Sequence, residues 1–437
     1  MGRFLPARPF SIQHRGPAMT IAITDPMTDA GGLDGAALAR RLRGLRRKGQ
    51  VKALLLIAPL MLFLIAVFVL PIGMLLTRAA DNREVSRTLP QTAAALDLWD
   101  GRDTPGEAIF AAFAADLKAA SSENVAEIAK RLNYYETGMR SMLMKTARLI
   151  RKADAPYRPA FAAIDPQWDT PRYWRVLKQA MPRLTDFYLL SALDLHRDET
   201  GAIAGMAGEN AFHRDILLRT FAVSVSVTLI CLLLGYPLAA LIARSQGAIA
   251  NTLLILVLLP FWTSLLVRTS AWVVLLQSRG VVNSALAWAG LIDPAAPLDL
   301  IYNRTGVLIA MTHILLPFMV LPIYSVMKSI PPVYMRAAAS LGAPPFSVFW
   351  RVYLPMSMPG VSAGCLLVFI LALGYYITPA LVGGQRDQMI SYFIAYYANQ
   401  VTNWGMAAAL SAILLVAVLV LYAVYNRLVG VDRLRMG

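Results

Sequence analysis

Polar and aromatic side chains inside long apolar segments are the first candidates for chemistry in this 437-residue chain. His313 is the only ionisable residue well inside such a segment, whereas Trp262, Tyr375, Tyr376 and Thr378 lie close to prolines or glycines that break helices. A break frees backbone groups that must be hydrogen-bonded away from lipid, so breaks with polar neighbours tend to line cavities. These five residues are therefore the candidates for a pathway through a membrane.

Each candidate also has a purely structural interpretation. A neutral histidine can hydrogen-bond a neighbouring helix. This interpretation and a position in a pathway explain His313 equally well. Tryptophan and tyrosine collect in belts at the two membrane interfaces, and this interpretation fits the aromatic positions better than a pathway does.

The composition requires a bilayer, because 57% of the residues are hydrophobic and only 15% are charged. A helix needs about 20 apolar residues to cross a membrane. Six segments meet this requirement or come close to it: 53–77, 216–243, 252–267, 306–327, 361–382 and 404–425. Residues 271–276 either prolong the third segment or fold back at the interface, and residues 278–305 and 385–402 are expected to form two outer loops. We predict an all-α membrane protein with six transmembrane helices and a helical extracytoplasmic insert between the first and second, with residues 215–430 forming a five-helix core.

The net charge of +15 is concentrated outside the insert. Residues 78–215 carry 19 basic and 19 acidic side chains, whereas residues 1–52 carry ten basic and three acidic ones. A basic cluster directly before the first span predicts a cytoplasmic N-terminus, and six spans return the tail, 431–437, to the same side. This distribution indicates a membrane partner rather than nucleic acid. Residues 1–52 are expected to be a largely disordered cytoplasmic segment.

The insert, residues 78–214, is long enough to form a small domain on the outer side. Residues 124–152 show a rough helical stripe of Met, Leu and Tyr side chains. We expect three tryptophans to anchor the core of this domain: Trp99, Trp168 and Trp174. His196, which has Asp194 and Asp198 nearby, is expected to lie on a solvated polar face.

The loop from Pro331 to Pro359 predicts a helix, a turn and a second helix. Apolar residues recur at helical spacing up to Leu341, and Gly342 is expected to end that helix as a C-terminal cap. A second short helix is expected to end where Pro355 breaks it. Small side chains on the first helix allow another backbone to approach closely, so we predict a docking surface there.

Part of this loop resembles the EAA loop of ABC transporter permeases. The resemblance rests on Ala337 and Ala338, on Gly342, and on Val352, Leu354 and Pro355 at the family's spacing, with Arg336 standing where the motif has glutamate. In that family the loop supplies cytoplasmic coupling helices that sit in a cleft of an ATPase subunit. These seven residues are therefore the candidates for ATPase docking, and an ordinary amphipathic connector is the alternative.

Three further segments, residues 232–245, 258–272 and 315–330, are similar to spermidine/putrescine-type permeases of the type I importer class. The resemblance implies one permease subunit in a bacterial inner membrane. Its partners would be a second permease, an ATPase dimer that holds ATP and Mg²⁺, an external binding protein and membrane lipid. The cargo implied is a polyamine. Amino-acid derivatives, phosphonates and ferric ion are the other cargoes to consider.

The chain lacks several sequence features of other functions. It has no GxxxxGK[ST] phosphate loop, no Cys/His cluster for a metal, and no Asp or Glu in the six segments. Cys231 and Cys365 lie in apolar segments and are expected to pack as small hydrophobes. We therefore expect no enzyme activity and no cofactor on this chain. A polyamine would cross the six segments without a carboxylate partner, so substrate specificity is expected to rest mainly with the binding protein. A secondary transporter or a membrane sensor are the alternative classes.

Overall fold

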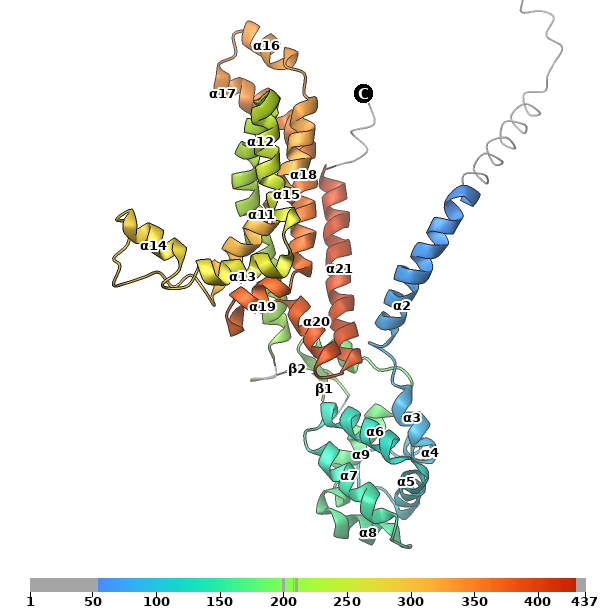
Figure 1. Ribbon diagram of the computed structural model, residues 1–437. Coiled ribbons are helices and arrows are strands. Elements are labelled where there is room, and N and C mark those ends of the chain that lie inside the picture. Colours follow the sequence, from blue (N-terminus) through green and yellow to red (C-terminus); the bar gives the residue numbers. More distant parts are fainter. Residues whose placement is uncertain (1–53, 199–200, 207, 209–210, 430–437) are drawn as a thin grey trace, which may run out of the picture. The chain divides into compact units, whose positions relative to one another are not determined.

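A computed structural model describes residues 54–198, 201–206, 208 and 211–429 (Figure 1). The predictions for residues 1–52 and 431–437 lie outside these ranges. The chain divides into two units, residues 1–71 and 72–437, and each is described by itself. The helix Leu54–Thr77 begins in the first unit, and its most apolar stretch has a mean hydropathy of 2.9. A π turn at Ile65–Val69 interrupts the α-helical hydrogen bonding, and the last part of the helix is α2 (Leu70–Thr77). The 24 residues of the whole helix are enough to cross a bilayer.

The insert is a small helical domain. Its elements are α3 (Arg83–Thr88), α4 (Pro90–Asp97), α5 (Glu107–Ala119), α6 (Ser122–Tyr135), α7 (Met139–Ile150), α8 (Tyr157–Ile164), a 3-10 turn (Pro166–Asp169), α9 (Pro171–Ala180), α10 (Phe187–Ser191), and strands β1 (Leu195–Arg197) and β2 (Ile203–Gly205), which pair antiparallel. The stripe predicted over residues 124–152 is divided between α6 and α7. Gly138 adopts a left-handed φ of +97° there, a conformation that glycine tolerates best.

Aromatic side chains fill the core of the insert. The rings of Trp168 and Trp174 are fully buried and lie 5.3 Å apart, and Phe113 contacts both. Trp168 Nε1 donates to Thr146 Oγ1 at 2.8 Å, so the buried indole is hydrogen-bonded. The expectation for Trp168 and Trp174 is confirmed, whereas Trp99 packs at the edge of the core and is only half-buried.

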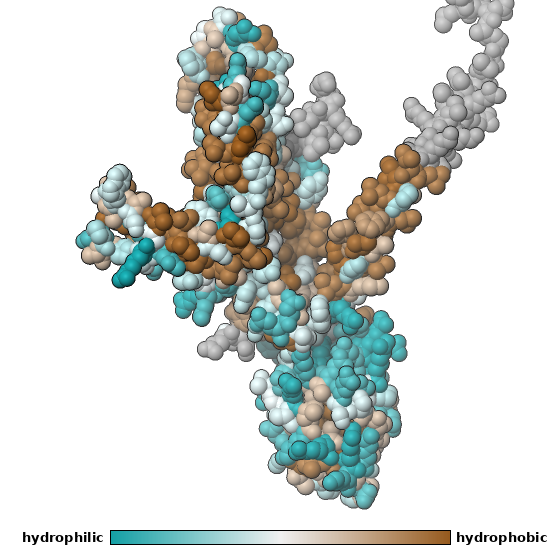
Figure 2. Space-filling view, in the orientation of Figure 1, coloured by the Kyte–Doolittle hydropathy of each residue, from teal (hydrophilic) through white to brown (hydrophobic). Residues whose placement is uncertain are grey.

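The chain that follows the insert is built from longer apolar helices. They are α11 (His213–Arg244), α12 (Gly247–Leu258), a 3-10 turn (Leu259–Trp262), α13 (Leu265–Leu275), α14 (Val281–Trp288), α15 (Arg304–Ser329), α16 (Val333–Ser340), α17 (Pro345–Val348), a π turn (Phe349–Tyr353), α18 (Leu354–Gly374), α19 (Ile377–Val382), a 3-10 turn (Gln385–Asp387), α20 (Ile390–Asn399) and α21 (Trp404–Val429). The surface of the insert is mainly hydrophilic, whereas the flanks of these helices are mainly hydrophobic (Figure 2).

Helices α11, α15 and α18 form the centre of the five-helix core predicted for residues 215–430. Cys231 Sγ lies 3.6 Å from Thr312 O, and a Cβ on Gly235 would lie 3.0 Å from Met319 Cγ, so α11 and α15 run parallel. Helix α18 runs in the opposite direction, because Phe221 lies near Phe369 and Tyr236 lies near Ser357. The ends of α11 and α15 and the start of α18 therefore share one end of the bundle. The insert leads into the start of α11 at the other.

Glycines allow α15 and α18 to approach closely. A Cβ on Gly360 would lie 2.9 Å from Pro322 O, and one on Gly364 would lie 2.9 Å from Met319 Sδ. Two glycines four residues apart are a typical signature of close helix packing in membranes. The Gly360-x-x-x-Gly364 spacing is visible in the sequence and could have predicted this contact.

The all-α class is confirmed, and the described residues contain five apolar helices long enough to span a membrane, or six if one bent pair counts as a span. That pair corrects the predicted third span, 252–267. Gly247–Trp262 and Leu265–Leu275 meet at an angle of 99°. Pro260 lacks an N–H, and Arg268 donates to Pro260 O and to Thr263 O, so an arginine satisfies the carbonyls that the break frees.

The predicted fifth span, 361–382, is wrong at both ends. The helix runs from Pro345 to Gly374, and α19 follows as a separate short helix. Pro355 does not break it, because a π turn immediately precedes α18 and Leu354 N–H bonds Phe349 O one residue further back than in an α-helix. This wider turn makes room for the proline ring.

The two outer loops are also more ordered than predicted, since residues 278–305 contain α14 and residues 385–402 contain α20. The solvated face predicted around His196 is wrong as well. His196 lies half-buried on β1, and Asp194 is buried, with only 5% of its surface exposed.

Candidate functional site

The loop that joins α15 to α18 presents a short helix and a turn at one end of the core. Helix α16 ends as predicted, because Gly342 has a φ of +84°. Gly342 N donates to Ala339 O at 2.9 Å and Ala343 N donates to Ala338 O at 3.2 Å, which satisfies the last carbonyls of the helix. The chain then turns sharply into α17.

The seven candidate docking residues do not form one uniform surface. Arg336, Ala337, Gly342 and Pro355 are exposed, whereas Ala338, Val352 and Leu354 are half-buried. The small residues of α16 thus lie partly at the surface, and the Val-x-Leu-Pro end of the motif lies where α18 begins.

The most exposed large apolar side chains at this end were not among the predicted residues. Leu341 is 89% exposed and Phe346 is 74% exposed, one on each side of the turn. Large exposed apolar groups in this density mark an interaction surface. Leu341 and Phe346 both belong to the apolar positions that recur at helical spacing in the sequence, which was the signal for this surface.

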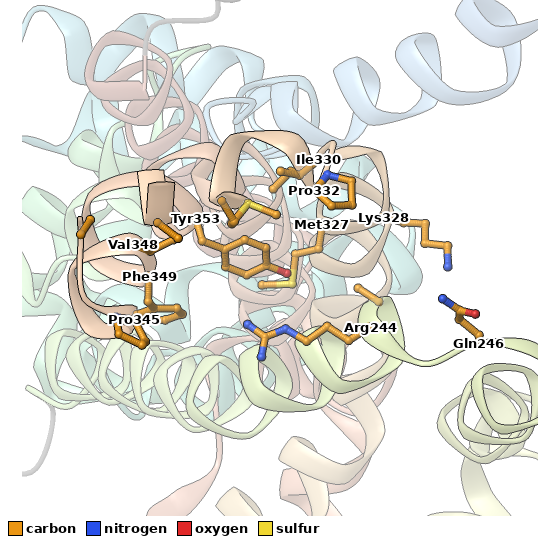
Figure 3. Close-up of a pocket in the computed structure, with 14 residues that line it drawn as sticks. Arg244, Gln246, Met327, Lys328, Ile330, Pro332, Pro345, Val348, Phe349 and Tyr353 are labelled. Atoms are coloured by element: carbon orange, nitrogen blue, oxygen red, sulfur yellow. The ribbon is translucent and has the colours of Figure 1, made fainter. Parts of the chain in front are cut away.

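A hollow of about 760 Å³ lies behind α16 (Figure 3). Its apolar wall is formed by side chains from α15, the loop and the π turn, including Met327, Ile330 and Phe349. The guanidinium of Arg244 lies 5.4 Å from the centre of the Tyr353 ring, within the range of a cation–π contact. The sequence patterns that predicted the loop gave no indication of this hollow.

Three of the five candidate pathway residues lie at the bent third span or contact it. Trp272 Nε1 on α13 donates to His313 Nδ1 on α15 at 3.1 Å. Thr378 on α19 is fully buried, and its hydroxyl lies 3.2 Å from that of Thr269 on α13. Trp262 is 73% exposed at the break itself. His313 thus has the neighbouring-helix hydrogen bond of its structural interpretation.

Tyr375 and Tyr376 occupy the break between α18 and α19. Tyr375 is half-buried, and Tyr376 is 43% exposed. Arg268 donates to Thr263 O at the break beside Trp262, and Trp272 on the same helix contacts His313, so a positive charge lies close to these candidates. Arg268 and Trp272 were missed as site residues, since the sequence places Arg268 just beyond the end of the third span and allows residues 271–276 either to prolong that span or to fold back at the interface.

A buried polar network fixes the end of the insert to the core. Asp194 Oδ1 accepts from His213 N and lies 3.0 Å from His213 Nδ1, while Asp194 Oδ2 accepts from Arg214 N at 2.8 Å. These bonds satisfy N–H groups in the first turn of α11. His213 Nε2 lies 3.3 Å from Tyr397 Oη on α20, and burial raises the pKa of Tyr397 to about 12.

Further contacts join the insert to the start of α21. Lys130 on α6 donates to Val401 O at 2.7 Å. The ring of Tyr188 lies so close to Gly405 that any side chain at that position would collide with it. Glycine at position 405 is therefore a requirement of the junction between insert and core.

A family model described as "Binding-protein-dependent transport system inner membrane component" matches residues 217–431. The spermidine/putrescine transport system permease protein PotB of Escherichia coli (strain K12) is 35% identical over 213 residues, which cover 49% of this chain and 77% of PotB. The molybdenum transport system permease protein ModB of Mycobacterium bovis is 32% identical over 219 residues, covering 49% of this chain and 80% of ModB. The family-model match begins after the insert.

Among solved structures, a chain of a bacterial alginate ABC transporter in complex with an alginate pentasaccharide-bound periplasmic protein is 20% identical. The alignment has a TM-score of 0.41 and covers 50% of this chain and 78% of that chain.

Proposed function

The chain belongs to the family of binding-protein-dependent transport system inner membrane components, and from this premise we propose that its cargo is a polyamine such as putrescine or spermidine. It is a multi-pass permease of the type I ABC importer class and a transporter component rather than an enzyme. The observation that carries the cargo proposal is the 35% identity to PotB over 77% of that protein. This membership gives no support to the sensor or the secondary transporter.

In this proposal ATP and Mg²⁺ are bound by a separate ATPase dimer. The loop Pro331–Pro359 docks in a groove of that dimer, with Arg336, Ala337, Ala338, Gly342, Val352, Leu354 and Pro355 at or near the contact. The exposed side chains of Leu341 and Phe346 support the proposal, because burying both on a partner would contribute several kcal/mol (about 1.5–3 each). The loop contains no acidic residue, so Arg336 favours an acidic partner surface.

The remaining partners are a second permease subunit and an external binding protein. The antiparallel arrangement of α11 and α18 supports opposite sides for the loop and the insert. With the loop in the cytoplasm, the chain termini are cytoplasmic, and the insert is on the side where a binding protein delivers cargo.

A second cargo class, a small anion, is favoured by one observation. Arg268 lies on α13 next to the break at Trp262, on the helix whose Trp272 contacts His313, and residues 216–292 contain no carboxylate to neutralise it. A fixed cation there repels a polyamine and attracts an oxyanion. The molybdenum permease ModB is a relative of similar coverage.

Transport by the purified complex distinguishes the two cargoes. The tagged full-length chain would be isolated from its bacterial membranes with its partners and reconstituted in vesicles that contain ATP. The polyamine proposal predicts vanadate-sensitive uptake of radiolabelled putrescine that excess molybdate does not reduce. Uptake of molybdate without uptake of putrescine or spermidine would overturn the polyamine proposal and leave the family assignment intact.

A variant tests the pathway separately. Replacing His313 with Phe removes the acceptor of Trp272 Nε1 and the polar group facing α13. If His313 lines the pathway, the KM or the rate of uptake changes while the amount of assembled complex does not. Unchanged uptake would leave His313 with a purely structural role.

A further inference from the structure

The hollow behind α16 lies at the boundary of the membrane. Arg244 is the last residue of the apolar helix His213–Arg244, and Lys328 is the next-to-last residue of Arg304–Ser329. Both side chains are exposed, and both line the hollow (Figure 3). Basic residues at the ends of spanning helices extend to the level of the lipid headgroups. This placement holds for either orientation of the chain.

The two cations have no carboxylate partner. Neither Arg244 nor Lys328 forms an ion pair in the described part of the chain. Residues 300–386 contain no Asp or Glu at all. Asp387, the first carboxylate beyond that range, pairs with Arg304 at the opposite end of α15. The hollow therefore has an uncompensated positive charge at its edge.

The wall of the hollow is apolar. Met327, Ile330 and Tyr353 belong to the buried hydrophobic core, whereas Met335, Ala343 and Phe349 are only half-buried and present apolar surface to the hollow. A small polar anion could neutralise the cations but would leave this wall facing water. An amphipathic anion satisfies both parts, because its charge meets the cations and its hydrocarbon covers the wall.

We propose that this hollow is a binding site for one anionic phospholipid, with the anionic headgroup at its basic edge, formed by Arg244 and Lys328, and an acyl chain against Met335 and Phe349. The charge complementarity selects an anionic headgroup, and the position at the helix ends selects a lipid. The bound lipid supports α16 from behind, so it stiffens the loop that precedes α18.

Native mass spectrometry of the purified full-length chain in detergent tests the site. The chain would be titrated with phosphatidylglycerol, with phosphatidylcholine of the same acyl chains, and with glycerol phosphate alone. We expect one phosphatidylglycerol to be retained preferentially. Because each cation near an anionic headgroup contributes about a fivefold change in affinity, Arg244→Gln with Lys328→Gln should weaken retention about 25-fold.

Two further variants separate the site from general surface charge. Arg351 is exposed on the same loop but does not line the hollow, so Arg351→Gln should retain the lipid as the unaltered chain does. Ala339 lines the hollow, so Ala339→Phe should displace the lipid while both cations remain. Equal elution volume and helix content of all variants would show that they are folded.

Four outcomes would overturn the proposal. Equal retention of phosphatidylcholine would assign the hollow to any acyl chain, and displacement by glycerol phosphate would assign it to a small phosphate. Equal loss in Arg351→Gln would reduce the effect to general attraction. A hollow that stays empty in excess phosphatidylglycerol would leave the cations to an acidic surface of a protein partner.

Discussion

The insert and the permease core differ in how much of their apolar surface is covered within the chain. In the insert, the large aromatic side chains Phe113, Trp168 and Trp174 are completely buried. In the core, the buried share is 61% for the most apolar stretch of α15 and only 22% for that of α21. Only one of the central helices is thus mostly covered by its own chain.

The difference shows that the two parts are stabilised by different means. Water drives the burial of aromatic rings in the insert. Between lipid-exposed helices this driving force is absent, so close packing at small residues must hold α15 against α18. The insert can thus be complete by itself, whereas the core leaves surfaces for lipid and for other subunits. Three substitutions test this comparison.

The largest effect is expected for Trp168→Ala in the insert. The change empties a site whose side chain is fully buried and removes the hydrogen bond from Trp168 Nε1 to the hydroxyl of Thr146, which keeps its own bond to Met142 O. We expect a loss of about 4 kcal/mol of local stability, equivalent to about a thousandfold loss of hydrogen-exchange protection in the insert. Hydrogen exchange of the full-length chain, followed by mass spectrometry, measures it.

The control for this substitution is Trp288→Ala, because Trp288 is 91% exposed. It should change protection by less than about 0.5 kcal/mol. Equal loss of protection in α15 and in the insert after Trp168→Ala would contradict the independence of the two parts.

A smaller effect is expected for Gly364→Ala in the core. The added methyl group would lie 2.9 Å from Met319 Sδ and 3.0 Å from Met319 O, so α15 and α18 must separate. Overpacking of this kind costs about 1–3 kcal/mol. Thermal unfolding in detergent should show a lower midpoint for this variant.

Gly374→Ala is the matched control on the same helix, because a Cβ there would have no atom within 4 Å. Its unfolding midpoint should equal that of the unaltered chain. If both substitutions lower the midpoint equally, close packing at Gly364 is not what holds the two helices together.

The smallest effect concerns Glu84 at the junction of insert and core. Burial, followed by the nearby carboxylate of Glu127, raises the pKa of Glu84 above its ordinary value of 4.5. Ionisation of Glu84 therefore opposes folding. The protonated carboxyl contributes to stability at low pH, and this contribution is lost as the pH rises through the raised pKa. Glu84→Gln should match the unaltered chain below about pH 4 and gain a small relative stability toward neutral pH.

Unfolding midpoints of the two proteins at a series of pH values measure this gain. The side chain is half-exposed, and Glu84 lies 3.8 Å from Arg78, so solvent and a weak ion pair limit the effect. A difference that grows toward low pH would contradict the assigned direction.

The sequence predicted the helical class and most long segments because apolar length alone decides them. It failed at two prolines, Pro260 and Pro355, although the helices that contain Pro237, Pro317 and Pro322 were predicted. Pro355 lies inside a continuous helix that a π turn accommodates, whereas Pro260 lies at a 99° bend that Arg268 stabilises. Proline shows where a helix can change direction, but the neighbouring side chains decide whether it does.

The candidate site was predicted in part for a similar reason. The turn at Gly342 follows from glycine's freedom to adopt a left-handed backbone, so the sequence could place it. The hydrogen bond between Trp272 and His313 joins residues 41 positions apart and depends on the bend of the third span. The sequence pattern does not encode that proximity directly.

The central claim is that the loop Pro331–Pro359 couples this chain to an ATPase, and one substitution tests it most directly. Leu341→Asp places a charge in the most exposed apolar side chain of the turn, and Leu291→Asp, at a 71% exposed leucine in the outer loop, is the control. With both variants expressed in the native membrane, the amount of ATPase that co-purifies with the tagged chain is measured. We predict a loss of more than about tenfold for Leu341→Asp and none for Leu291→Asp. Normal ATPase recovery with Leu341→Asp would contradict docking at this turn.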